Sequence, residues 1–164
     1  MPQRSPAHDA ADHTLQDLKT LTRGLAAKDH LLSHAAAEWK VDIAQRLAAS
    51  QCHLTWAFQA DTEVQLNVVQ WSGLTRILRE LVNNVIAHSQ ARRVDIEFML
   101  DGDRLDLTVT DNGTGRNPQA WAHGLGLGGV RKRVKQLGGE VDWREVPAGG
   151  ICCRVCIRQL SEKI

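Results

Sequence analysis

The chain has 164 residues, of which 43% are hydrophobic and 24% are charged, and these ordinary globular proportions exclude a disordered or fibrous protein. Its 20 Lys and Arg residues are nearly balanced by 19 Asp and Glu residues, so it lacks the basic excess of a protein that binds nucleic acid through the phosphates. This length suits one domain with a helical extension.

The first fifty residues are predicted to be mainly helical. In residues 13–25, leucines recur at helical spacing. Residues 31–50 are expected to form a second helix that Ser33 caps. Its buried stripe is predicted to consist of Ala36, Trp39, Ile43 and Leu47. We therefore assign residues 1–50 to an N-terminal helical segment.

The remaining residues, 51–164, alternate between strand and helix patterns. Strands are predicted over 52–59, 64–69, 93–100, 104–111, 140–146 and 151–160. Helices are expected over 72–89, where Ser72 would be the cap, and over 126–137, and a long loop is expected over 112–124. This order predicts an α+β fold in which helices pack on one side of a sheet.

The four cysteines are predicted to be structural thiols. Cys52 stands alone, whereas Cys152, Cys153 and Cys156 lie in one predicted strand. Because side chains on a strand alternate between faces, Cys153 would point away from the other two. The Cys153-x-x-Cys156 pair therefore lacks the geometry of a metal knuckle, and we expect no zinc or iron site.

A row of polar residues lies along one face of the predicted helix 72–89. Glu80, Asn84 and His88 are spaced by four residues and so share one helical face beside the apolar stripe. Carboxylate and amide oxygens with an imidazole in line suit a divalent cation and a phosphate. The alternative is an ordinary solvated helix face.

A second cluster is Asp111-Asn112-Gly113-Thr114-Gly115, directly after an alternating strand. An Asp at this place can accept a hydrogen bond from an amino group such as that of adenine, and Gly113 and Gly115 let the backbone approach a ligand. The alternative is a simple strand-ending turn, for which these residues are common.

A third cluster, Gly124-Leu-Gly126-Leu-Gly128-Gly129, opens the last predicted helix. Glycine amides at a helix N-terminus favour an anion. A dinucleotide-binding fold is not indicated, because the motif does not follow the first strand of a βαβ unit. The sequence also contains no P-loop motif.

In this order, the three clusters resemble the nucleotide-binding domain that gyrases, heat-shock chaperones, histidine kinases and mismatch-repair proteins share, known as the GHKL or Bergerat fold. The segments RELVNNVIAHSQA, TVTDNGTG and GLGLGGVRKRVKQLGGEV look like the ATP-binding domain of a bacterial sensor histidine kinase, of the nitrate-sensor type with its short lid. The likeness covers roughly residues 52–158. Residues 13–50 are similar to the end of a dimerisation helix pair and its connection to the ATPase domain.

The resemblance implies a two-layer α/β sandwich with a mixed, mostly antiparallel sheet, and ATP and Mg²⁺ as cofactors. It implies that Asn84 ligates Mg²⁺ and that Glu80 supports catalysis. The implied nucleotide-binding residues are Asn84, His88, Asp111, Gly113, Gly115, Gly124 and Gly126. Of these, Asp111 would read the adenine, and Gly124 and Gly126 would lie beside the phosphates.

Two residues depart from the family pattern. Ala87 stands where a lysine or arginine often reaches the phosphates, and Ile151 stands where a threonine is usual near the pocket. Both departures weaken the expected hold on nucleotide, for which His88, Arg131 or Arg133 could compensate.

The expected reaction is transfer of the ATP γ-phosphoryl to a histidine on a dimerisation domain, for relay to a response regulator. His8 lies too close to Glu80 for a complete helix pair to intervene, so we expect the acceptor to lie outside this chain. The alternatives are a related serine kinase that sequesters a sigma factor, and a degenerate domain that binds partners without phosphoryl transfer.

No apolar run approaches the ~20 residues that a membrane helix needs, and the start has no secretory signal. We therefore expect a soluble, cytoplasmic chain that binds no nucleic acid. A cytoplasmic portion of a membrane-anchored kinase would look the same.

Overall fold

The computed structural model describes residues 30–114 and 127–160. Its main sheet has five strands in the order β2-β4-β5-β7-β6. Their bounds are His53–Ala60 for β2, Arg93–Asp101 for β4, Arg104–Asp111 for β5, Gly139–Glu145 for β6 and Ile151–Ile157 for β7. Only β2 and β4 pair in parallel, and the other neighbours are antiparallel. The sheet is therefore mixed and mostly antiparallel, as predicted.

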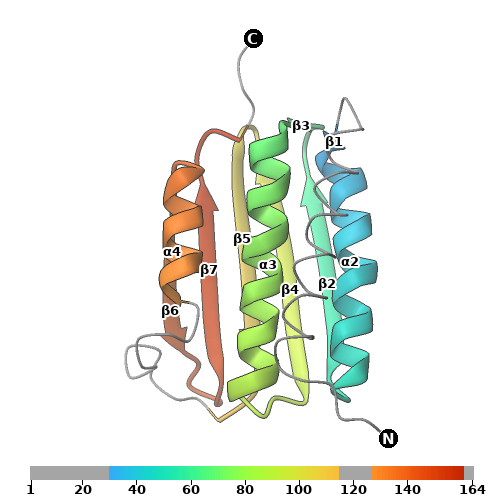
Figure 1. Cartoon of the computed structure of the whole chain (residues 1–164), viewed down its shortest axis with the longest axis vertical. Coiled ribbons are helices and arrows are strands. Elements are labelled where there is room, and N and C mark those ends of the chain that lie inside the picture. Colours follow the sequence, from blue (N-terminus) through green and yellow to red (C-terminus); the bar gives the residue numbers. More distant parts are fainter. Residues whose placement is uncertain (1–29, 115–126, 161–164) are drawn as a thin grey trace, which may run out of the picture.

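Within the described residues, three helices cover one face of this sheet (Figure 1). They are α2 (Leu32–Ala49), α3 (Val68–His88) and α4 (Leu127–Gln136). In the view of Figure 1, α3 lies in front of the centre of the sheet, α2 lies on the side of β2 and α4 on the side of β6. The predicted two-layer sandwich with its helices on one face is confirmed.

Alternation along the strands explains why only one face is covered. In β4 the side chains of Val94, Ile96, Phe98 and Leu100 are buried, and those between them are at least partly exposed. The same alternation in β5 and β7 places mainly apolar residues under the helices and charged residues, threonines and cysteines on the opposite face. The helices bring their own apolar stripes to this core, and those predicted for 31–50 and 72–89 are buried.

The start of α3 differs from the prediction. The helix begins at Val68, not at Ser72, and Asn67 is its cap. The Asn67 side chain accepts a hydrogen bond from the Gln70 amide, and the Gln70 side chain accepts one from the Asn67 amide. This capping box extends the helix into the predicted strand 64–69, of which only β3 (Gln65–Leu66) remains.

The predicted cap of α2 is also wrong. Ser33 lies inside the first turn, and Leu31, which precedes the helix, makes no side-chain cap. Instead, the Glu63 carboxylate accepts hydrogen bonds from the amide and the hydroxyl of Ser33, which lowers the pKa of Glu63. The short strand β1 (His30–Leu31), which pairs with β3, brings the two segments together.

The other predicted helices and strands of the described part are found with shifts of at most three residues at their ends, and the strand 104–111 with none. The β4–β5 hairpin turns at Gly102, whose φ of 62° suits glycine. All four cysteines are free, and Cys153 is buried, whereas Cys152 and Cys156 lie on the opposite face. The predicted helix 13–25 and His8 lie outside the described residues. Among the described residues, no helix has the length and apolar character needed to cross a membrane.

Candidate nucleotide site

Asn84 and Asp111 meet at one cavity between α3 and the inner face of the sheet. The cavity is lined by Leu81, Asn84, Val85, Val109, Asp111, Trp143, Ile151 and Cys153. Asn84 projects from α3, and Asp111 ends β5 beneath that helix. Two polar side chains that converge in an otherwise apolar cavity are typical of a small-molecule site.

Asp111 is a buried carboxyl group, with only 4% of the residue exposed. Burial raises its pKa, and hydrogen bonds from the backbone amides of Gly113 and Ile151 oppose that rise. Both donors favour the ionised carboxylate and fix its direction. The side chain is therefore held as an acceptor at the edge of the cavity.

Two glycines allow the chain to pack closely around Asp111. A Cβ on Gly113 would overlap the backbone of Ser89 at the end of α3, and the amide of Thr114 donates to the Ser89 carbonyl. A Cβ on Gly150 would overlap the Asp111 carbonyl, and Gly150 has a φ of 105°. In the structure Gly113 allows the ends of α3 and β5 to approach each other, and its predicted place beside a ligand stays a prediction.

Asn84 carries a buried amide nitrogen that has no hydrogen-bond partner among residues 30–114 and 127–160. A buried donor without a partner costs free energy that a hydrogen bond to a polar ligand would recover, so this atom is compatible with a polar ligand in the cavity. Mg²⁺ is usually held by one or two protein oxygens together with substrate phosphates and water, and the amide oxygen of Asn84 fits that requirement.

Glu80 lies one turn before Asn84 on the same face and pairs with Arg133 of α4. Both side chains remain partly exposed, 30% for Glu80 and 26% for Arg133. Gly129, in the first turn of α4, lies against this pair, because a Cβ there would be 3.1 Å from Arg133 Nη1 and 3.4 Å from a Glu80 oxygen. The pair therefore joins the middle of α3 to α4.

The other predicted site residues are less closely tied to the cavity. His88 and Ala87 are exposed near the end of α3, and neither lines the cavity. Gly115, Gly124 and Gly126 lie outside the described residues. Of the two arginines that could compensate for Ala87, Arg133 is paired with Glu80, and Arg131 lies over the ring of Trp143.

Sequence reasoning missed Trp143 as a lining residue. The alternation of β6 places it on the inner face, because it pairs with the buried Cys153 of β7. That alternation was visible in the sequence, but the distance from β6 to Asp111 was not.

Solved structures share this architecture. The catalytic domain of histidine kinase ThkA superposes with a TM-score of 0.61 at 16% identity, covering 81% of this chain and 97% of that one. The Acinetobacter baumannii histidine kinase AdeS gives 0.63 at 16% identity, covering 98% and 88%. The fold is thus that of histidine kinase catalytic domains.

Sequence comparison identifies the family of this chain. Residues 70–161 match the family described as "Histidine kinase-, DNA gyrase B-, and HSP90-like ATPase", and the chain belongs to it. It is 36% identical over 87 residues to the histidine-protein kinase/phosphatase UhpB of Salmonella typhimurium, covering 53% of this chain and 17% of that protein. It is 32% identical over 98 residues to the sensor histidine kinase LiaS of Bacillus subtilis, covering 59% and 26%.

The chain therefore carries an ATPase catalytic domain of the sensor histidine kinase type. It spans about a sixth of the length of UhpB and about a quarter of the length of LiaS.

Proposed function

We propose that this domain binds Mg²⁺–ATP between α3 and the inner face of the sheet and transfers the γ-phosphoryl to a histidine. The acceptor histidine belongs to a dimerisation domain, which passes the phosphoryl group to a response regulator. The observation that carries the proposal is the convergence of Asn84 and Asp111 on one cavity.

At the base end, Asp111 accepts a hydrogen bond from the adenine amino group. The side chains that line the cavity then bury the base. Ile151 replaces the usual threonine and makes the floor beside Asp111 apolar. This costs one hydrogen bond to the base but retains van der Waals contact with its flat face.

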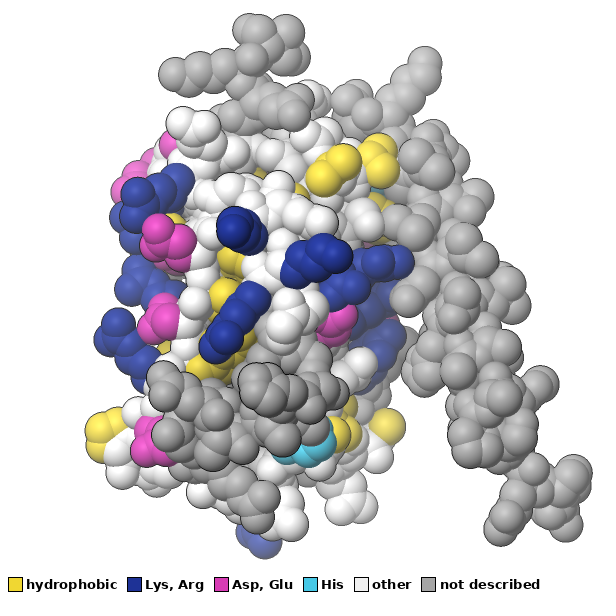
Figure 2. Space-filling model, turned by 60° about the vertical axis from the view of Figure 1, so that its left-hand side comes forward, with side chains coloured by type: hydrophobic (Ala, Val, Ile, Leu, Met, Phe, Trp, Pro, Cys, Tyr) yellow, Lys and Arg dark blue, Asp and Glu magenta, His cyan; other side chains and the backbone are white. Residues whose placement is uncertain are grey.

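At the phosphate end, the Asn84 amide oxygen binds the metal ion. When bound, Mg²⁺ neutralises charge on the phosphates. The sequence of α4 holds four basic residues and no acidic one. Figure 2 shows Lys and Arg side chains spread over this side of the molecule, which favours the approach of an anionic nucleotide.

Glu80 is the candidate for proton handling at the acceptor histidine. Its pairing with Arg133 sets the orientation of the carboxylate. Phosphoryl transfer depends mainly on in-line positioning and charge neutralisation, so a fixed carboxylate serves it better than a mobile one.

The subfamily and the cellular location are assigned from the resemblance of the sequence motifs to sensor histidine kinases. We place the domain with the nitrate-sensor type, because only residues 112–126 separate β5 from α4 and leave room for a short lid. We place it on the cytoplasmic side, as a portion of a kinase that a membrane segment anchors.

The first test is calorimetric titration with ATP in the presence and absence of Mg²⁺. Wild-type protein is expected to bind ATP more tightly with Mg²⁺, and Asn84→Ala is expected to abolish that difference without unfolding. Asn83→Ala is the matched control, since Asn83 is the exposed neighbour on the same helix. If Asn84→Ala binds Mg²⁺–ATP as tightly as wild type, the metal assignment is wrong.

The second test uses labelled ATP and Mg²⁺. Alone, the chain is expected to bind ATP without labelling itself, and acid-labile label is expected on a separately supplied acceptor helix domain. Acid-stable label would favour the serine kinase, and binding without any transfer would favour the degenerate domain. Stoichiometric label on His8 would show that the chain contains its own acceptor.

A further inference from the structure

Trp143 forms one wall of the cavity that holds Asp111 and Asn84. Strand pairing places Val109 of β5, Cys153 of β7 and Trp143 of β6 in one row across the inner face. All three residues line the cavity. Trp143 is half-buried: it packs against the core, and part of the residue remains exposed.

The spacing of the strands relates this wall to a bound base. Neighbouring strands lie about 4.8 Å apart, so the backbone of β6 is about 10 Å from that of β5. A purine held by its amino group at Asp111 would extend across β7, over the apolar side chains of Ile151 and Cys153. The edge of the base remote from Asp111 then reaches the indole.

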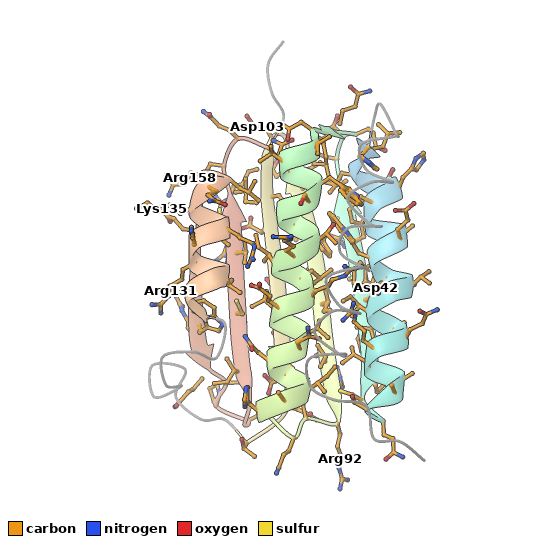
Figure 3. The ribbon with its side chains drawn as sticks, viewed as in Figure 1. Asp42, Arg92, Asp103, Arg131, Lys135 and Arg158 are labelled. Carbon is orange, nitrogen blue, oxygen red and sulfur yellow. The ribbon has the colours of Figure 1, made fainter. Side chains whose placement is uncertain are left out.

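Arg131 holds the indole from the side of α4. Its guanidinium carbon lies 5.2 Å from the centroid of the Trp143 ring, which is a cation–π contact. Figure 3 shows Arg131 at the left-hand edge of α4, the helix that packs against β6. Arg131 therefore restricts the ring and links α4 to the wall of the cavity.

We propose that Trp143 contacts the base of the bound nucleotide and favours flat, bicyclic bases, and that Arg131 is the residue that positions its ring. The proposal rests on the proposed nucleotide-binding function and adds a specificity determinant to it. Aromatic rings and bases associate by offset stacking or edge contacts at centroid distances of roughly 4.5–7 Å.

The test compares ADP with inorganic triphosphate, because only ADP carries a base. Trp143→Leu is expected to weaken ADP binding by about five- to thirtyfold, the lower part of the range for losing a base–aromatic contact, and to leave triphosphate binding unchanged. Trp56→Leu is the matched control, since Trp56 is also half-buried on the inner face but lies at the opposite edge of the sheet, packed on Phe98.

A spectroscopic readout keeps the test independent of folding effects in the leucine variant. Trp143→Phe retains an aromatic ring and is expected to lose the Trp143 component of the ADP-induced change in tryptophan emission, whereas Trp56→Phe keeps it. Arg131→Met is expected to weaken ADP binding by about two- to threefold, and Arg131→Lys, which keeps the cation, is expected to restore most of it.

The outcomes distinguish the role of Trp143 from nucleotide binding itself. Equal losses for ADP and triphosphate in Trp143→Leu, or an unchanged emission response in Trp143→Phe, would overturn the role of Trp143 while leaving nucleotide binding intact. Failure of the wild-type protein to bind ADP at all would overturn the proposed function itself.

Discussion

The base end and the phosphate end of the proposed site are built in different ways. At the base end, most of the contacts involve the backbone. Two backbone amides donate hydrogen bonds to Asp111, and Gly113 and Gly150 allow main chains to pack where no Cβ would fit. At the phosphate end, the contacts are between side chains. Glu80 pairs with Arg133, and Asn84 keeps an amide nitrogen without a partner in the described part of the chain.

This difference has a physical consequence. Main-chain contacts inside a packed core can change only if the fold changes, so the base end is organised before nucleotide arrives. The partly exposed ion pair at the phosphate end can exchange its partners at little cost. Substitutions that add a side chain where main chains meet at the base end should therefore lower stability strongly, whereas those at the phosphate end should affect stability weakly.

The largest expected effect is that of Gly150→Ala. The added Cβ would overlap the Asp111 carbonyl and would force alanine to a φ of 105°. Backbone strain and overpacking together are expected to lower the free energy of unfolding by about 2–5 kcal/mol, measured by urea denaturation. Gly128→Ala is the control, because a Cβ there meets nothing within 4 Å. Equal stabilities of the two variants would show that the base end is not rigid.

Asp111→Asn separates base recognition from phosphate binding. The asparagine keeps the shape but presents an amide, so ADP binding is expected to weaken by about 1–3 kcal/mol, whereas triphosphate binding is unchanged. Because burial raises the pKa of Asp111, its ionisation costs the folded state free energy, and a neutral asparagine should not lower the melting temperature at neutral pH. Calorimetry with both ligands tests the first point. Equal losses for ADP and triphosphate would remove the adenine role.

The pKa of Asp111 also predicts how base binding depends on pH. The raised pKa means that the carboxylate takes up a proton at a higher pH than an ordinary Asp, whose pKa is 3.8. ADP affinity should therefore fall on acidification before ordinary aspartates titrate. The contribution of this group to the free energy of unfolding should instead increase on acidification, because burial penalises the charged form and not the neutral one. Asp111→Asn should remove this component, and an identical pH profile in the variant would contradict the assignment.

Much of the fold and part of the site follow from local patterns in the sequence. The stripe of α3 and the hairpin that ends at Asp111 were predictable, because each depends on residues close together in the chain. The start of α3 was missed because Val68 and Val69 favour strands. In the structure, the Asn67–Gln70 capping box stabilises a helix at these residues instead.

Contacts between distant segments could not be predicted in this way. Glu63 replaces Ser33 as the group that caps α2, across thirty positions of the sequence. In the same way, Trp143 reaches the cavity only because β6 is placed two strands from β5. The sequence shows which side chains face inward, but the order of strands decides which of them meet.

The smallest effect is expected at the Glu80–Arg133 pair, and it tests the phosphate end directly. A double-mutant cycle of Glu80→Gln and Arg133→Met should give a coupling of about 0.2–1 kcal/mol in the free energy of unfolding, because both side chains are partly exposed. The coupling should decrease as salt screens the charges. Arg79 and Asp42, which join α3 to α2 at 3.0 Å, provide a control pair away from the cavity. If Glu80 and Arg133 act together in the reaction, their coupling in the transfer rate to a supplied acceptor will exceed their coupling in stability. Equal coupling in both measurements would mean that the pair only joins two helices.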